Sequence, residues 1–172
     1  MSGSVTKLSR VAAVERAHTF VGVKEHPAGS NRGPQIDVWQ KRTNGVTGYP
    51  WCGAFVYCMF ADVGTRILAP LPALVQSWVD WAAAVGDTVT RPLRGDVVCF
   101  DWNRDNWHDH IGLVDRVLAL RWSRKRFVGL IRTVEGNTSA GNDSNGGQVQ
   151  VRLRWVNDKT VFVRIPGNVP NV

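Results

Sequence analysis

The sequence predicts a single α+β domain in which helices come first and an antiparallel β-sheet follows. The main observation is a change of period, because apolar residues recur at helical spacing up to residue 85 and alternate with a period of two from Arg91 onwards. The chain has 172 residues, which suffices for one hydrophobic core, and no linker or repeat divides it. Hydrophobic residues make up 44% and charged residues 20%, which is ordinary for a globular domain and excludes a disordered chain. We therefore expect one domain over residues 1–172.

Four helices are expected in the first half of the chain. The third is apolar on nearly every face, which indicates that it is buried on all sides. It begins near Trp51 or Cys52, because Pro50 disfavours helix at the residue before it and is tolerated at a helix start. The helices are expected at residues 5–23, 35–42, 51–63 and 73–85, with Trp78 and Trp81 of the last one facing inward.

Five strands are expected in the second half, where apolar and polar residues alternate between clusters of turn-forming residues. A basic segment at residues 121–126 is expected at the tip of a hairpin, and residues 141–147 form a turn rich in glycine, serine and asparagine. The strands are expected at residues 96–101, 110–120, 127–135, 148–155 and 160–165.

The net charge of +7 is concentrated in the C-terminal third. Residues 116–172 contain 10 Lys or Arg and 3 Asp or Glu, whereas residues 1–115 contain 11 of each. A one-sided basic surface favours an anionic partner such as a nucleic acid, an acidic polymer or a cell envelope. A merely solvated face is the competing interpretation. No stretch approaches the ~20 apolar residues of a membrane span.

The three cysteines do not form a C-x-x-C pair, so neither a disulfide framework nor a structural zinc site is indicated. Cys58 and Cys99 are interpreted as small buried hydrophobic residues. Cys52 differs, because the start of a helix is the positive end of the helix dipole, where a thiolate is stabilised. On this stretch alone, a reactive cysteine and a structural cysteine are equally good interpretations of Cys52.

A cysteine nucleophile needs a base that takes its proton and a third group that orients the base. His110 opens an expected strand, so a rigid backbone supports its side chain, whereas His108 lies in a polar loop. We therefore favour His110 as the base. The next strand carries the candidates for the third group, since a period of two places Glu135 and Asn137 on one face if the strand runs that far. An ordinary strand-end turn is the competing interpretation there.

Three motifs together resemble the CHAP family (cysteine, histidine-dependent amidohydrolases and peptidases), which is a papain-like group. They are the cysteine motif at residues 50–56, the segment 95–100 leading to the histidine motif at 110–114, and Val-Glu-Gly-Asn at 134–137. The resemblance spans about residues 20–165. It implies a papain-like fold in which N-terminal helices pack on a C-terminal antiparallel sheet.

The resemblance also implies roles for individual residues. Cys52 looks like the nucleophile that attacks an amide carbonyl, and His110 looks like the base that returns the proton to the leaving amine. Glu135 looks like the orienting residue, with Asn137 as a helper or substitute. Some members carry an acidic calcium loop before the nucleophile, but residues 42–48 contain no carboxylate, so no calcium is expected at that position. No other metal and no cofactor is expected.

The substrate class that the resemblance implies is peptidoglycan, cut either between muramic acid and L-alanine or within the wall peptide. Further candidates for substrate contact are Tyr49, Trp51, Trp102 and Trp107, although core packing is an equally good interpretation of Trp102. Anionic cell-wall polymers are possible additional partners of the basic third. The expected protein is a monomer or one module of a larger lysin.

The N-terminus has no apolar signal-peptide core. We therefore expect a phage lysin that is made in the host cytoplasm and reaches the wall after holin-mediated release or on a virion.

Two rival hypotheses remain. One is a metal-dependent hydrolase that uses His108 and His110 together with Asp101 or Asp105, although His-x-His alone is a weak ligand signal. The other is a non-catalytic module that binds cell wall or nucleic acid through the basic C-terminal face, but no nucleic-acid motif accompanies this face.

Overall fold

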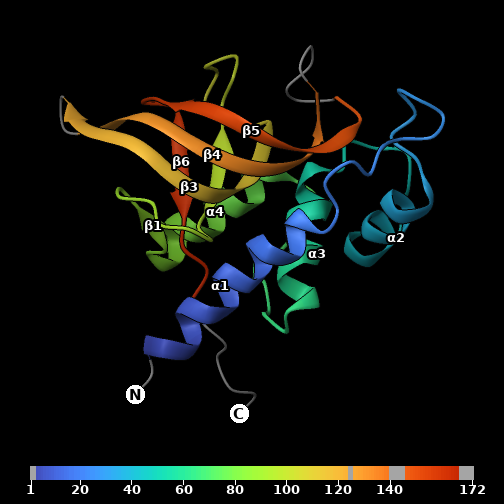
Figure 1. The fold of residues 1–172 in the computed structure, drawn as a ribbon, viewed down its shortest axis with the longest axis horizontal. Helices are drawn as coiled ribbons and strands as arrows, with labels where there is room; N and C mark the ends of the chain where they lie inside the picture. Colours follow the sequence, from blue (N-terminus) through green and yellow to red (C-terminus); the bar gives the residue numbers. More distant parts are fainter. Residues whose placement is uncertain (1–2, 124–125, 140–145, 167–172) are drawn as a thin grey trace.

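The structure is a computed structural model and describes residues 3–123, 126–139 and 146–166. Within these residues, four helices precede six strands along the chain. Figure 1 shows how these elements are arranged. The helices are α1 (Gly3–His18), α2 (Pro34–Thr43), α3 (Cys52–Asp62) and α4 (Val75–Val85). The strands are β1 (Thr88–Val89), β2 (Val97–Phe100), β3 (His110–Ser123), β4 (Arg126–Thr138), β5 (Gln148–Val156) and β6 (Thr160–Val163).

All six strands belong to one antiparallel sheet in the order β1-β6-β2-β3-β4-β5. Strands β3, β4 and β5 follow one another as hairpins, and β6 then crosses back to lie between β1 and β2. The sheet is strongly twisted, so that β6 runs at a steep angle to β4 and β5 in Figure 1. Helices α1, α3 and α4 pack on one face of the sheet, because residues of all three helices belong to one buried cluster with residues of β2, β3 and β4. This arrangement confirms the predicted α+β class and the packing of N-terminal helices on a C-terminal sheet.

Each face of the sheet carries its own buried cluster, because successive side chains of a strand point to opposite faces. Ile111, Leu113 and Val134 face the helices and pack in the larger cluster around α3. Val114 and Ile131 point to the opposite face and belong to a second cluster. Helix α3 is central to the larger one, since eight of its eleven residues are buried, as its apolar sequence predicts.

The structure corrects the predicted end of the first helix. Helix α1 ends at His18 rather than near Gly22. The next three backbone N–H groups, of residues 19–21, donate to carbonyls only three residues back, and the N–H of Gly22 donates to the carbonyl of Val149 in β5 (3.0 Å). Pairing with the sheet therefore ends the helix early.

The sheet also differs from the prediction in detail. The two-residue strand β1 was not predicted, and β3 and β4 are both longer than expected, ending at Ser123 and Thr138. The centre of the predicted basic hairpin tip, residues 124–125, lies outside the described residues, as do residues 141–145 of the predicted glycine-rich turn. In the described part of the chain, no helix is long and apolar enough to cross a membrane.

Candidate active site

Cys52 is the first residue of α3, and Trp51 is its N-cap. The first helical hydrogen bond runs from the N–H of Phe55 to the carbonyl of Trp51 (2.9 Å). The N–H groups of the first turn therefore have no partner within the helix, and they give this end its partial positive charge. The Cys52 side chain is nearly buried, with 3% of the residue exposed.

Packing behind Cys52 fixes the start of α3. The Trp51 ring is fully buried and stacks on Trp39, with ring centroids 5.6 Å apart. Its indole N–H donates to the Glu25 carboxylate (3.0 Å). At Gly53, the residue after Cys52, a Cβ would lie 2.6 Å from the carbonyl oxygen of Pro72. Only glycine therefore lets the segment before α4 approach the helix so closely.

His110 is the first residue of β3 and pairs with Phe100 of β2. Its side chain is fully buried, and the ring lies against the rings of Phe100 and Trp102, with centroids 6.2 and 6.3 Å away. The imidazole is therefore buried next to two aromatic rings that lie roughly parallel to it.

Glu135 of β4 holds the imidazole from the other side. Its Oε2 lies 2.9 Å from Nε2 of His110, and both side chains are fully buried. Glu135 reaches His110 by crossing Gly112, where a Cβ would lie only 2.6 Å from its Cγ. The hydroxyl of Thr133 donates to Oε1 (2.6 Å), so Thr133 and Glu135 share one face, as the period of two predicts.

Arg154 of β5 was not predicted from the sequence, and it is buried in the site with 5% of the residue exposed. Its Nε donates to Oε1 of Glu135 (2.8 Å), and its Nη2 donates to Oε2 of the same carboxylate (2.5 Å). The guanidinium also lies over the Trp102 ring, 5.1 Å from its centroid. Such a bidentate pair fixes a carboxylate in position and in charge.

These contacts set the charges of the site. Burial alone would lower the pKa of His110, but its interactions with Cys52 and Glu135 outweigh burial and raise it to about 9. Burial would raise the pKa of Glu135, but the hydrogen bonds from Arg154 and His110 outweigh it and lower the value to about 2. At neutral pH the site therefore holds an ionised Glu135 and favours an imidazolium next to Cys52.

The second ring nitrogen of His110, Nδ1, has no hydrogen-bond partner of ordinary geometry among the described residues. Nε2 is already engaged by Glu135, so Nδ1 is the ring atom left for the Cys52 sulfur. Ring nitrogens that receive or release a proton in a reaction are often imperfectly aligned before the substrate binds.

The other two cysteines have different surroundings. Cys58 lies on a later turn of α3 with its Sγ 3.7 Å from the Trp39 carbonyl, and burial raises its pKa to about 12. Cys99 in β2 is fully buried, and burial also raises its pKa. Both cysteines belong to the buried hydrophobic cluster around α3, which confirms their prediction as buried hydrophobic residues. None of the three cysteines forms a disulfide.

Asn137 is buried and lies at a register irregularity between Glu135 and Thr138. Its φ is +58°, so it departs from regular strand geometry, and its carbonyl accepts a hydrogen bond from the N–H of Gly146 (2.9 Å). Of the two predicted orienting residues, Glu135 is the one whose side chain hydrogen-bonds His110. At Gly136, between them, a Cβ would lie 2.7 Å from Cβ of Phe55, so glycine lets β4 pack against α3.

The four residues predicted to contact substrate lie in different environments. Tyr49 and Trp107 are 61% and 53% exposed. Tyr49 also lines a cavity of about 270 Å³ next to the start of α3. Trp102 is half-buried and stacks on Phe100 at 4.4 Å, which agrees with core packing. Trp51 has no exposed surface, so we assign it to packing rather than to substrate contact.

The rival hypothesis of a metal-dependent hydrolase needs His108 and His110 close together with an aspartate. Among the described residues, no group of three or more His, Cys, Asp or Glu side chains is placed to hold a metal ion. His108 is turned toward α4, where its Nδ1 lies 3.1 Å from the side-chain oxygen of Gln76, while His110 is engaged by Glu135.

The fold and the site define a papain-like α+β domain, in which a cysteine at a helix start lies beside a histidine and a carboxylate held on an antiparallel sheet. The family model described as CHAP domain matches residues 44–137, more than half of the chain. The chain therefore belongs to the CHAP domain family, whose members are typically cysteine- and histidine-dependent amidohydrolases that act on peptidoglycan. No curated protein and no solved structure matches the chain. Arg154 lies outside the segment that the family model matches.

Proposed function

We propose that this protein hydrolyses an amide bond of the peptidoglycan peptide with Cys52 as nucleophile, His110 as base and Glu135 as orienting residue. The main support is a buried series of hydrogen bonds from Arg154 through Glu135 to His110. His110 lies next to the helix start that bears Cys52. Membership of the CHAP family supports the substrate class. The bond is either that of an N-acetylmuramoyl-L-alanine amidase or one within the wall peptide.

The proposed reaction has two stages. Nδ1 of His110 takes the Cys52 proton, and the thiolate attacks the amide carbonyl to form a tetrahedral intermediate. The N–H of Cys52 donates to the developing oxyanion, where a donor in place is worth about 3–4 kcal/mol. As the C–N bond breaks, His110 returns the proton to the leaving amine and a thioester remains. His110 then takes a proton from water, the hydroxide attacks the thioester, and the carboxylic acid and the Cys52 thiol are released.

The remaining candidates have supporting roles in this proposal. Asn137 helps to hold the end of β4 against the site, and Tyr49 contributes a second oxyanion donor or a substrate contact from the cavity that it lines. The exposed Trp107 supplies a surface on which sugar or peptide can stack. We extend the proposal to a lytic enzyme of phage type. Its basic C-terminal third would favour adsorption to an anionic wall.

Mass spectrometry of fragments from purified sacculi tests this proposal. New peptide amino groups support amide hydrolysis, and the fragment masses identify the bond. Binding to sacculi without any release of amines would instead favour the alternative, a non-catalytic module. Release of reducing ends alone would exclude amide cleavage. Activity that chelators abolish would support the metal-dependent hypothesis.

The pH dependence of the reaction follows from His110. Its pKa of about 9 means that the imidazolium, which must protonate the leaving amine, is lost as the pH rises through about 9. We expect kcat/KM to fall in that range. Glu135→Gln removes a carboxylate that raises this pKa, so the alkaline limb should move to lower pH by on the order of one unit. Initial rates of amine release between pH 5 and about 10 test this, and an unmoved limb in Glu135→Gln would contradict the assignment.

A further inference from the structure

A second and larger cavity lies away from Cys52, between the segment before β2 and the middle of β3. Its volume is about 670 Å³. The segment 91–94 forms one wall, residues 115–120 of β3 form the other, and Arg132 of β4 completes it. The groups that hold His110, namely Glu135 and the rings of Phe100 and Trp102, do not line this cavity. We call it the arginine groove.

The arginine groove has an excess of positive charge. Among the described residues that line the groove, Asp115 is the one carboxylate, whereas four residues are arginines. Asp115 is already shared, since its oxygens lie 2.6 Å from Nε of Arg132, 3.4 Å from Nε of Arg94 and 3.2 Å from Nε2 of His18. Arg91 and Arg116 are exposed and take part in no ion pair within the described chain. The groove therefore carries unbalanced cationic charge.

The register of the sheet concentrates this charge. Arg116 of β3 lies directly opposite Arg132 of β4, next to a register irregularity at Asp115. Like charges directly opposite each other on neighbouring strands destabilise a sheet. Asp115 compensates Arg132 but has no contact of this kind with Arg116 in the structure. An anion bound in the groove next to Arg116 and Arg132 would supply the missing charge.

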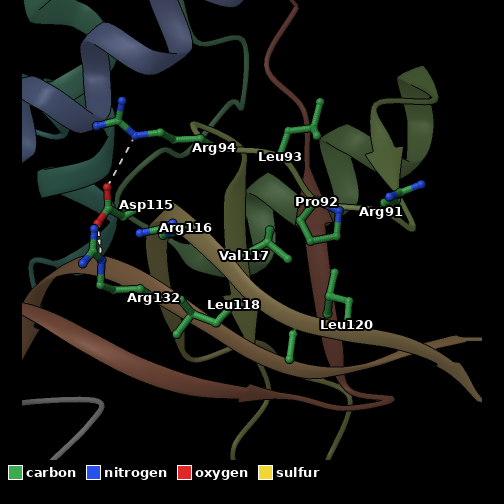
Figure 2. Close-up of a pocket in the computed structure, with 11 residues that line it drawn as sticks. Arg91, Pro92, Leu93, Arg94, Asp115, Arg116, Val117, Leu118, Leu120 and Arg132 are labelled. Atoms are coloured by element: carbon green, nitrogen blue, oxygen red, sulfur yellow. Dashed lines mark hydrogen bonds and ion pairs between the residues drawn. The ribbon is translucent and has the colours of Figure 1, made fainter.

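The arrangement of the side chains indicates the kind of anion. Figure 2 shows Arg94, Arg116 and Arg132 around Asp115 at one end of the groove and Arg91 at the other. Apolar side chains lie between the two ends (Figure 2), and they belong to Pro92, Val117, Leu118 and Leu120. Two cationic ends with an apolar middle suit anions separated by a short carbon chain. No aromatic residue occurs among the described lining residues, so the groove lacks the stacking surface typical of single-stranded nucleic acid sites.

We infer that the arginine groove binds a polyol-phosphate polymer of the bacterial cell wall. Guanidinium groups donate two parallel hydrogen bonds to a phosphate, and the apolar floor accommodates the polyol carbons. The inference rests on the proposed function only for its location at the cell wall. It gives Arg116 and Arg132 of the basic C-terminal third a specific role, together with Arg91 and Arg94 from the segment before β2. The groove holds the protein on the wall while the separate Cys52 site cuts peptide.

The test compares two double variants of the full chain. Arg91→Gln/Arg116→Gln removes two exposed charges of the groove, and Lys41→Gln/Arg66→Gln removes two exposed charges elsewhere. Co-sedimentation is measured with sacculi that carry polyol phosphate and with sacculi stripped of it by hydrofluoric acid. We expect the groove variant to bind the phosphate-bearing sacculi about tenfold more weakly, with no loss on stripped sacculi and none for the control variant. The wild-type affinity for phosphate-bearing sacculi should fall with added salt.

Equal loss in the two double variants would contradict the inference, because it would indicate a general charge effect. Equal wild-type binding to stripped and phosphate-bearing sacculi would contradict it as well. Stronger competition by single-stranded DNA than by soluble poly(glycerol phosphate) would assign the groove to nucleic acid instead. Amine release from stripped sacculi is measured separately, and we expect it to be unchanged in the groove variant. A loss of binding with unchanged hydrolysis supports the inference, and an inactive wild type would contradict the proposed function alone.

Discussion

Replacing Cys52 with alanine is expected to reduce amide hydrolysis of purified sacculi by about a thousandfold or more. The proposed reaction passes through a thioester, and alanine cannot form one. The substitution removes one sulfur atom from a nearly buried position, so the free energy of unfolding should change by only about 1 kcal/mol. Free amines released from sacculi measure the activity, and urea unfolding measures the stability.

Cys58→Ser and Cys99→Ser are the matched controls, because both cysteines are buried and protonated. A serine hydroxyl in an apolar site costs about 1–3 kcal/mol, so these variants should lose stability but keep hydrolysis at nearly the wild-type rate. An active Cys52→Ala protein, or a loss of activity in all three variants that stability does not explain, would contradict the assignment of Cys52.

Replacing Arg154 with methionine is expected to destabilise the protein by about 3 kcal/mol and to slow hydrolysis about tenfold or more. The substitution leaves Glu135 fully buried without the two hydrogen bonds that Arg154 donates to it. Because those bonds lower the pKa of Glu135, the carboxyl should then protonate more readily and lose its hold on the imidazolium of His110. Urea unfolding and amine release, each as a function of pH, measure the two effects.

The double variant Arg154→Met/Glu135→Gln separates charge from shape. It removes both partners of the buried ion pair, so part of the lost stability should return, whereas hydrolysis should remain slow because no ionised carboxylate orients His110. Strictly additive losses of stability would show that Arg154 and Glu135 do not act as a pair. A wild-type rate in Arg154→Met would exclude a positioning role for Arg154.

The sequence predicted the fold class and most of the elements because its periodicity is clear. Helix α3 is apolar on nearly every face and is buried, and α2 begins at Pro34, one residue before the predicted start. The end of α1 was predicted wrongly because hydrogen bonds to β5, which is 130 residues later in the chain, decide where it stops. Such long-range pairing leaves no local signal.

The candidate site shows the same limit. The sequence pointed to His110 and Glu135, and the structure brings them into contact. The glycines of the motifs also have a physical basis: Gly112 makes room for the Glu135 side chain, and Gly53 lets the neighbouring loop approach α3.

Arg154 could not be found from the sequence, because the alternation in β5 misleads. Apolar residues in that strand, such as Leu153 and Trp155, predict an inward face, yet these two are 60% and 73% exposed and Arg154 is buried. The reason is that β5 is the outermost strand of the sheet, and the buried Glu135 on β4 needs a cationic partner from its neighbour. The burial of Arg154 depends on a charge on another strand, and hydrophobic periodicity within β5 cannot predict it.

Mass spectrometry of the protein after acid quenching during digestion of sacculi detects the proposed thioester itself. We expect a covalent adduct with the mass of a peptidoglycan acyl group, carried by the peptide that contains Cys52 and absent from those that contain Cys58 and Cys99. The assignment of Cys52 would be contradicted if protein with fully alkylated Cys52 still hydrolysed sacculi rapidly and no cysteine carried an adduct.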